Sequence, residues 1–149
     1  MGCRERRWNG PSFPASAAGR KRVVIEGGDG AERWLLARAF AEAGFDVARR
    51  AGPIENGGPC PLVAGRGCDA VESADAVVNL LGLRSRACED VLRAVREVAP
   101  RAALVAQATA VDRGASEPVL AETACAVVSP RAPAEEIIQL SRSTTSRSL

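Results

Sequence analysis

The sequence of 149 residues contains no histidine and no tyrosine, and aromatic residues make up only 3% of it. The lack of histidine excludes a Ser-His-Asp triad, a Cys-His pair, a histidine phosphorelay and histidine metal ligands from anything this chain does alone. The few aromatic residues are not interleaved with basic ones. A base-stacking platform is therefore not expected, and neither is nucleic acid as a partner.

Long hydrophobic runs are also missing, since no apolar run approaches the roughly 20 residues that span a bilayer. The first 22 residues are basic and lack the apolar segment of a secretory signal. Gly2 follows the initial Met, but Arg6 stands where N-myristoylation requires a small hydroxyl residue. We expect a cytoplasmic protein with no membrane partner.

Composition indicates one globular domain between two basic ends. Hydrophobic residues make up 46% of the chain and charged residues 26%, which are ordinary values for a globular protein. Residues 1–20 are rich in Gly, Pro, Ser and Arg and are expected to form a disordered basic arm. Residues 143–149 are expected to form a disordered tail, which leaves residues 21–142 for an α/β domain.

The segment RVVIEGGDGAERWLLARAFAEAGFDV, residues 22–47, has the pattern of a strand, a glycine-rich turn, a helix and a second strand. Its short β-branched run predicts a buried strand. The helical spacing of its apolar residues predicts a helix over residues 31–43. The residues expected to form the buried face of that helix are Trp34, Leu35, Ala39 and Phe40.

Strands alternate with helices in the rest of the expected domain. Strands are predicted over residues 23–25, 45–48, 76–81, 102–106 and 126–128, and helices over 31–43, 69–74, 87–98, 117–123 and 133–142. This alternation predicts an α/β fold with three layers: a doubly wound, five-stranded parallel sheet of the flavodoxin-like order 2-1-3-4-5. Ligand sites in such folds lie at the carboxyl ends of the strands.

The glycine-rich turn after the first strand has two interpretations. Gly27, Gly28 and Gly30 would let backbone amides approach an anion, as in phosphate-binding loops. Alternatively, they supply the positive φ of a tight turn while Asp29 caps the following helix. A carboxylate at the helix start competes with an anionic ligand, so Asp29 favours the second interpretation.

The whole of residues 21–142 resembles a response-regulator receiver (CheY-like) domain. The opening segment RVVIEGGDGAERWLLARAFAEAGFDV carries this resemblance, together with DAVVNLLG, EDVLRAVREVAPRAALVAQAT and AVVSPRAPAEEIIQL in that order. The resemblance implies an acidic pair after the first strand for Mg²⁺, and an aspartate that accepts phosphate after the third. It also implies a hydroxyl residue after the fourth strand and a lysine after the fifth.

This sequence departs from that pattern at every one of these positions. Gly27 and Gly28 stand at the acidic pair, with Glu26 and Asp29 beside them, and Leu80 stands at the phosphoacceptor with Asn79 beside it. Gln107 or Ala108 stands near the hydroxyl position, with Thr109 after it, and Ser129 replaces the lysine. The sequence thus predicts a non-catalytic pseudo-receiver without a cofactor. The candidate ligand-binding residues are Glu26, Gly27, Gly28, Asp29, Gly30, Asn79, Thr109 and Ser129.

The expected partner is a protein or a second copy of the chain. The resemblance implies that the contact face is formed by the helix at residues 117–123, the strand at 126–128 and the helix at 133–142. Regulation through this face would be independent of phosphorylation.

A second resemblance, to the opening of atypical short-chain dehydrogenases, implies NAD(P) or nucleotide binding as the alternative function. Gly27 and Gly30 match the pattern G-x-x-G-x-x-G, but Arg33 replaces its third glycine. Asp46 lies near where a ribose-binding acid is expected. The catalytic tyrosine of that family is absent, so binding without dehydrogenase activity is what this resemblance predicts.

The cysteines offer a third hypothesis. Cys60 and Cys68 flank PLVAGRG within the Gly- and Pro-rich loop of residues 51–69, and they are candidates for a labile disulfide or for part of a metal site. The alternative is that they are two ordinary thiols. Cys88 is expected to be partly exposed, and Cys125 is expected in the core.

Overall fold

The computed structural model describes residues 19–50, 69–80 and 86–143. Five parallel strands form one sheet in the order β2-β1-β3-β4-β5. The predicted α/β class and strand order are therefore confirmed. The strands are β1 (Arg22–Gly27), β2 (Asp46–Arg50), β3 (Ala76–Leu80), β4 (Ala103–Gln107) and β5 (Ala126–Val128).

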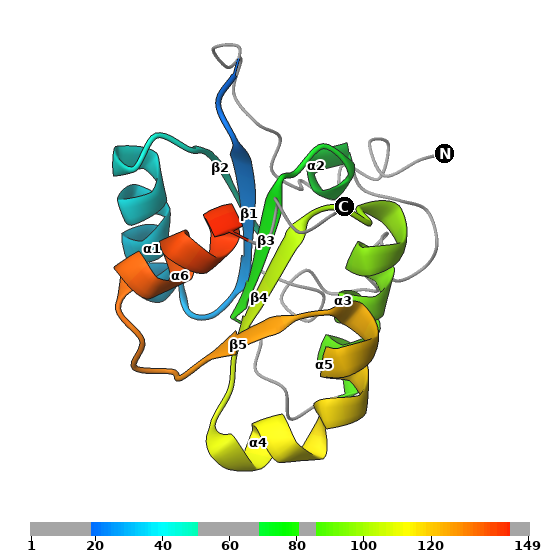
Figure 1. The fold of residues 1–149 in the computed structure, drawn as a ribbon. Helices are drawn as coiled ribbons and strands as arrows, with labels where there is room; N and C mark the ends of the chain where they lie inside the picture. The colour runs from blue at the N-terminus through cyan, green and yellow to red at the C-terminus, as the bar shows by residue number, and fades with distance from the viewer. Residues whose placement is uncertain (1–18, 51–68, 81–85, 144–149) are drawn as a thin grey trace.

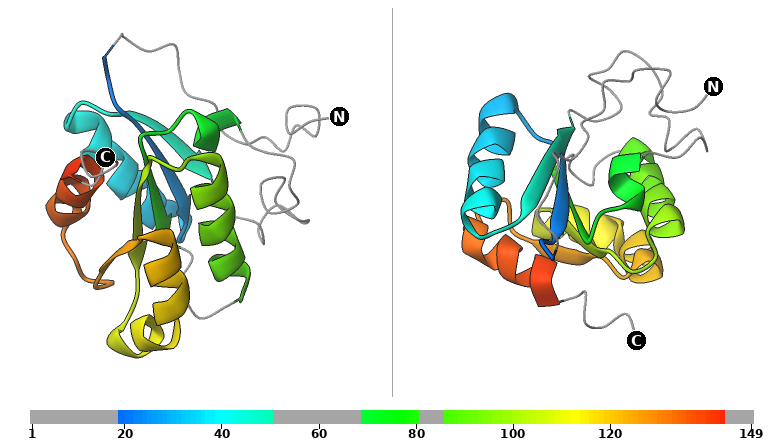
Figure 2. Two further views of the ribbon diagram at one scale, coloured as in Figure 1. Left: turned by 45° about the vertical axis from the view of Figure 1, so that its right-hand side comes forward. Right: turned by 90° about the horizontal axis from the view of Figure 1, so that it is seen from above.

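Helices cover both faces of this sheet (Figures 1 and 2). Helices α1 and α6 pack on one face, and α2, α3 and α5 pack on the other. Helix α4 lies beyond the carboxyl end of β4 (Figure 1). The helices are α1 (Gly30–Glu42), α2 (Asp69–Glu72), α3 (Arg86–Val98), α4 (Ala110–Ala115), α5 (Glu117–Thr123) and α6 (Ala134–Ser143).

The core has two halves because successive strand residues point to opposite faces of the sheet. In β1, Val23 and Ile25 join the half beneath α1 and α6, whereas Val24 joins the half beneath α3 and α5. All five residues of β3 are buried. This is why the central strands read as continuous apolar runs: a parallel sheet covered on both faces needs apolar residues on both.

Helix α1 begins and ends within one residue of the prediction, and its predicted buried face is right at Phe40 but wrong at Trp34 and Leu35. The Asp29 carboxylate accepts a hydrogen bond from the Glu32 backbone N–H at 2.7 Å, and Gly44 after the helix has a φ of +95°. Trp34 and Leu35 are 49% and 61% exposed. The buried residues of α1 are Leu36 and Phe40.

Two further expectations about side chains can be compared with the structure. The expectation that Cys88 is partly exposed is wrong, because only 1% of it is accessible. Cys125 is half-buried and packs against the core beneath α3. Helix α4 was not predicted at all. Its first turn is capped by Thr109, whose hydroxyl accepts a hydrogen bond from the Asp112 backbone N–H at 3.2 Å.

One side chain joins three segments on the α3 face of the sheet. The Arg96 guanidinium donates to the carbonyl oxygens of Pro100 and Ala102, each at 2.9 Å, in the turn between α3 and β4. It also donates to the Thr123 carbonyl at 2.8 Å, at the end of α5. Carbonyls that helix ends and turns leave without an internal partner are thus satisfied by one residue.

The predicted domain boundaries lie mostly outside the described residues. Of the arm predicted over residues 1–20 only residues 19 and 20 are described, and the Arg20 guanidinium lies 3.6 Å from the Asp46 carboxylate. Of the tail over residues 143–149 only residue 143 is described. In the described part of the chain, no helix has the length and apolar character needed to cross a membrane.

Candidate functional site

The carboxyl ends of β1 and β3 lie side by side at the centre of the sheet. In this parallel pair Glu26 is in register with Asn79, and Gly27 with Leu80. The structure therefore brings together the residues that the sequence places after the first and third strands. We call these strand ends the closed edge, because Leu80 packs against the turn after β1 there and an ion pair is fully buried beneath it.

The turn between β1 and α1 is held by Arg33. Gly27 and Gly28 have φ values of +80° and +72°. Their carbonyl oxygens accept hydrogen bonds from the Arg33 guanidinium at 3.0 and 2.7 Å. Arg33, which replaces the third glycine of a dinucleotide-binding loop, thus stabilises the turn through two hydrogen bonds.

Leu80 closes the space next to this turn. A Cβ atom placed on Gly28 would lie 3.1 Å from Leu80 Cδ1 and 2.6 Å from Glu32 Oε1. Leu80 itself is only 8% exposed. Gly28 is therefore required both by its positive φ and by the close approach of the leucine.

Asp29 and Gly30 do not join this group. Asp29 is exposed and is occupied as the cap of α1. Gly30 is the first residue of α1, and a Cβ there would meet no atom within 4 Å. The backbone at Gly30 thus has no steric need for glycine, in contrast to Gly28.

A buried ion pair lies beneath the closed edge. The Glu26 carboxylate and the Arg50 guanidinium are 3.1 Å apart, and both side chains are fully buried. Burial raises the pKa of Glu26, and the positive charge of Arg50 opposes that rise. The negative charge of Glu26, near the end of β1, is therefore already neutralised by Arg50.

Cys88 and Asn79 lie near this pair on the α3 side of the sheet. The Cys88 thiol donates to the Asn79 side-chain oxygen at 3.7 Å. Burial, reinforced by the negative charge of Glu26, raises the pKa of Cys88 to about 12, although the Asn79 hydrogen bond opposes the rise. A thiol with such a pKa is a poor nucleophile at neutral pH.

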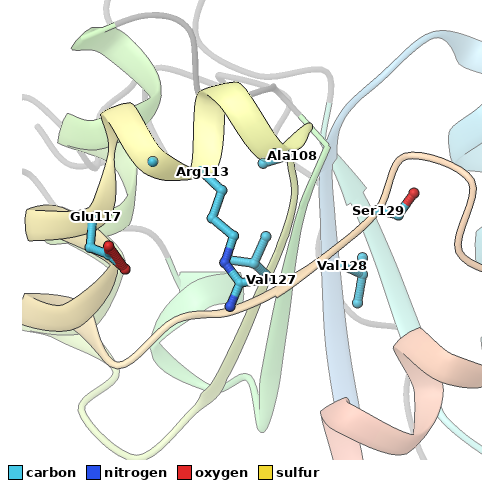
Figure 3. Close-up of a pocket in the computed structure, with 8 residues that line it drawn as sticks. Ala108, Arg113, Glu117, Val127, Val128 and Ser129 are labelled. Carbon is cyan, nitrogen blue, oxygen red and sulfur yellow. The ribbon is translucent and has the colours of Figure 1, made fainter.

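The carboxyl ends of β4 and β5 are open by comparison. A cavity of about 380 Å³ is bounded there by Ala108, α4, the start of α5 and β5. Arg113 extends from α4 across Val127, and Ser129 lies at the far side of the cavity (Figure 3). The Ser129 hydroxyl accepts a hydrogen bond from the Arg131 backbone N–H at 3.1 Å, so this side chain shapes the turn after β5.

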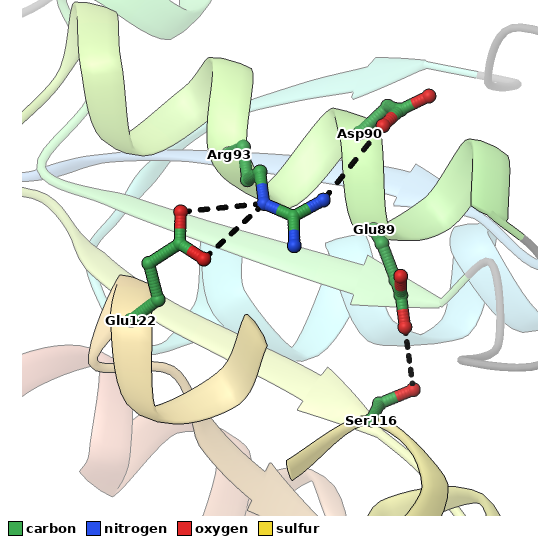
Figure 4. A network of polar contacts seen from close by, with 5 residues as sticks. All are labelled: Glu89, Asp90, Arg93, Ser116 and Glu122. Atoms are coloured by element: carbon green, nitrogen blue, oxygen red, sulfur yellow. Dashed lines mark hydrogen bonds and ion pairs between the residues drawn. The ribbon is translucent and has the colours of Figure 1, made fainter. Parts of the chain in front are cut away.

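Helix α5, beside this cavity, is fixed to α3 by polar contacts (Figure 4). Arg93 donates to both carboxylate oxygens of Glu122 at 3.3 Å and lies 3.9 Å from Asp90. The Ser116 hydroxyl donates to the Glu89 carboxylate at 3.2 Å. These contacts hold α5 and the residue before it against α3.

Comparison with solved structures identifies the fold. A receiver domain from Clostridium thermocellum matches with a TM-score of 0.67 and 13% identity, over 85% of this chain and 95% of that one. A receiver protein from Sinorhizobium medicae matches with a TM-score of 0.66 and 13% identity, over 89% and 100%. The receiver domain of nitrogen regulatory protein C matches with a TM-score of 0.64 and 17% identity, over 86% and 95%.

This chain has the fold of a response-regulator receiver domain. No protein-family model matches the sequence, and no curated protein matches it by sequence. The resemblance read from the order of motifs is therefore borne out at the level of the fold, across sequences that share less than a fifth of their residues.

The receiver fold sorts the predicted site residues into separate groups. Glu26, Gly27 and Asn79 meet at the ends of β1 and β3. Thr109 caps α4, and Ser129 borders the cavity next to β5. Asp46 begins β2, as its sequence position indicates, at the end of the sheet opposite to the carboxyl ends, whereas a ribose-binding acid would end that strand.

Some site residues were missed or lie outside the described residues. Arg50, Arg33 and Arg113 were not predicted to take part. Arg50 alone had a usable signal, since it lies two residues after the buried Ala48 and so points to the same face of the strand. Cys60 and Cys68 lie outside the described residues, and within the described ranges no group of three or more side chains is suited to hold a metal ion.

Proposed function

We propose that this chain is a pseudo-receiver: a regulatory or protein-interaction domain that does not carry out aspartyl-phosphate chemistry. The observation that supports this most directly is the closed edge between β1 and β3. Leu80 packs against Gly28 there, and Arg50 neutralises Glu26 inside the sheet. An incoming phosphoryl group would meet an apolar side chain that offers no nucleophile.

The residues along the sequence support the same proposal. The resemblance implies carboxylates at positions 27, 28 and 80. The residues present, Gly27, Gly28 and Leu80, have no side-chain group that can bind a cation or accept phosphate. No aspartate occurs between Asp75, which precedes β3, and Asp90 within α3. Ser129 offers a hydroxyl where a lysine would neutralise the transferred group.

The proposed contact face consists of α5, β5 and α6, and the proposed partner is a protein or a second copy. Three features support this choice. Strand β5 ends the order of the described sheet, its first two residues are only half-buried, and the cavity with Arg113 and Glu117 opens beside it. The polar contacts between α3 and α5 hold this face in one arrangement.

The proposal includes no cofactor and a cytoplasmic location. Binding of NAD(P) at the glycine-rich turn remains the alternative. Millimolar NAD(P) would then raise the melting temperature of the wild-type chain, and Gly30→Asp would abolish the rise, whereas the pseudo-receiver predicts no change.

The decisive experiment is incubation of the full chain with saturating acetyl phosphate and Mg²⁺, followed by intact-mass measurement. A phosphorylatable receiver domain treated in parallel serves as the positive control. We expect the control to gain a phosphoryl group and this chain to keep its mass. A stable adduct that hydroxylamine removes would contradict the proposal, because hydroxylamine sensitivity marks an acyl phosphate.

A further inference from the structure

The cavity at the carboxyl ends of β4 and β5 is lined by side chains of both charges. Its volume is about 380 Å³, and among the described residues Arg113 of α4 and Glu117 of α5 are the charged ones that line it. Figure 3 shows Arg113 extending across Val127, with Glu117 on the same side of β5. A ligand in this cavity would therefore meet a cation and a carboxylate together.

The fold itself does not use these two charges. In the part of the chain that the structure describes, no ion pair or side-chain hydrogen bond involves the Arg113 guanidinium or the Glu117 carboxylate. Helix α4 ends at Ala115 and α5 begins at Glu117, so the two residues lie on different helices. Ser116 between them donates to Glu89 on α3, which fixes the junction of the two helices.

The same four-residue spacing does produce an ion pair where the helix is continuous. On α1 the Arg38 guanidinium lies 3.2 Å from the Glu42 carboxylate, as this spacing within one helix favours. The junction at Ser116 thus separates two charges that a single helix would pair. Both remain exposed to solvent beside the cavity, where they can contact a third group.

The wall of the cavity next to these charges is apolar. Ala108 is buried, and Val127 is half-buried and packs against the core beneath α3. Small-molecule sites combine apolar walls with a few polar groups, in volumes of roughly 300–1,000 Å³. The cavity lies at the lower end of that range, and it is at the carboxyl ends of the strands, where α/β folds bind ligands.

The pair of opposite charges selects the chemical class of the ligand. A simple anion would be attracted by Arg113 and repelled by Glu117, and a simple cation would meet the reverse. A small molecule that carries a carboxylate and an ammonium group close together satisfies both residues. The end of a protein chain carries only one of these groups. A free amino acid carries both, and an aliphatic side chain on it would match the apolar wall.

We propose that this cavity binds a free aliphatic α-amino acid, with its carboxylate on Arg113, its ammonium group on Glu117 and its side chain against Ala108 and Val127. The cavity borders α5 and β5 of the proposed contact face, so the ligand would change that face without phosphate. Binding does not depend on the absence of phosphoryl chemistry. A phosphorylated adduct would overturn the pseudo-receiver proposal and leave this one standing.

The test is an NMR titration of the full chain with L-leucine that follows the backbone amides. Saturable shifts are expected in α4, in β5 and at the start of α5, at millimolar leucine or below. The matched ligands are isocaproate, which lacks the ammonium group of leucine, and isoamylamine, which lacks its carboxylate. Each is expected to bind about 5-fold more weakly, because it loses one charged contact. Equal binding of leucine and isocaproate would overturn the proposal.

Variants assign the binding to the two charges. Arg113→Gln and Glu117→Gln should each weaken leucine binding about 5-fold. Arg101→Gln, which removes an exposed arginine just before β4 at the opposite end of that strand, is the matched control and should leave binding unchanged. Thermal melting establishes that each variant is folded.

Two further results would overturn the proposal. The first is a wild-type chain that shows no saturable shift with leucine, which would leave Arg113 and Glu117 to a protein partner at the contact face. The second is an affinity for leucine that Arg113→Gln does not change, which would place the amino acid elsewhere on the domain.

Discussion

The two ends of the carboxyl edge of this sheet differ in how much of their structure is buried. At the end formed by β1 and β3, Leu80 packs against Gly28, an ion pair is fully buried, and an apolar groove of about 210 Å³ borders Leu80. At the end formed by β4 and β5, a cavity of about 380 Å³ is lined by exposed residues such as Arg113 and Ser129. The edge that carries chemistry in α/β folds is thus mainly apolar at one end and lined by exposed polar side chains at the other.

The contacts at the closed end indicate that this end stabilises the fold. Its residues are tied to each other: Arg50 to Glu26, and Arg33 to the carbonyls of Gly27 and Gly28. At the open end, the hydroxyls of Thr109 and Ser129 accept local hydrogen bonds from Asp112 and Arg131, and neither joins distant parts of the chain. Substitutions should therefore affect stability at the closed end far more than at the open end.

The largest effect is expected for Arg50→Ala. It leaves the Glu26 carboxylate buried without its cation, which should lower the free energy of unfolding by about 3–5 kcal/mol in urea titrations. Arg93→Ala, which breaks an exposed pair with Glu122, is the control and should cost about 1 kcal/mol or less. Equal losses in the two variants would show that the buried pair contributes nothing beyond a surface contact.

Gly28→Ala should follow, with a loss of about 2 kcal/mol. The alanine would be forced to a φ near +72° and its Cβ would press against Leu80. Gly30→Ala is the matched control two residues away, where the space is open and the position is helical. It should be neutral or stabilise by up to about 1 kcal/mol. The comparison is refuted by equal melting temperatures for the two alanine variants.

Alkaline pH should weaken the domain through Cys88. Its pKa in the folded state is about 12, above the ordinary value of 9.0, because the thiol is buried. The unfolded chain thus loses this proton first, so stability is retained below pH 9 and falls as the pH rises from 9 toward 12. By pH 10 the loss is about 1.4 kcal/mol for this thiol. Urea titrations at pH 8 and 10 should show a smaller drop for Cys88→Ala than for the wild type.

The smallest effects are expected at the open end. Thr109→Ala removes the cap of α4 and should cost about 1 kcal/mol. Ser129→Ala removes one exposed turn contact and should cost less than about 0.5 kcal/mol. Thermal melting measures both. A loss of stability for Ser129→Ala as large as that for Gly28→Ala would contradict the expected difference in stability between the two ends.

Much of the fold was predictable because the central strands are apolar on both faces. The run at residues 76–81 is typical of a buried strand, and all five predicted strands begin within one residue of those observed. Helix α4 was missed, because it is a single short element with Gly114 inside it. Its capping residue Thr109 was instead assigned to a possible site.

The site was harder to predict because its contacts join residues far apart in the sequence. Arg50 lies 24 residues after Glu26, and no local pattern links them. The exposure of Trp34 and Leu35 on α1 was not predicted for another reason. Its segment WLLARAFA has apolar residues on nearly every side, so spacing alone could not choose between Trp34 and Leu36 as the buried residue.

The Arg96 contacts have a consequence for how the domain opens. Because one guanidinium on α3 donates to the carbonyls of Pro100, Ala102 and Thr123, detachment of α3 breaks its contacts with both the α3–β4 turn and the end of α5. Transient local unfolding should therefore release α3 and α5 together as one cooperative unit. The amide hydrogens of these two helices would then exchange with solvent at a common rate, separate from those of α1 and α6 on the other side of the sheet.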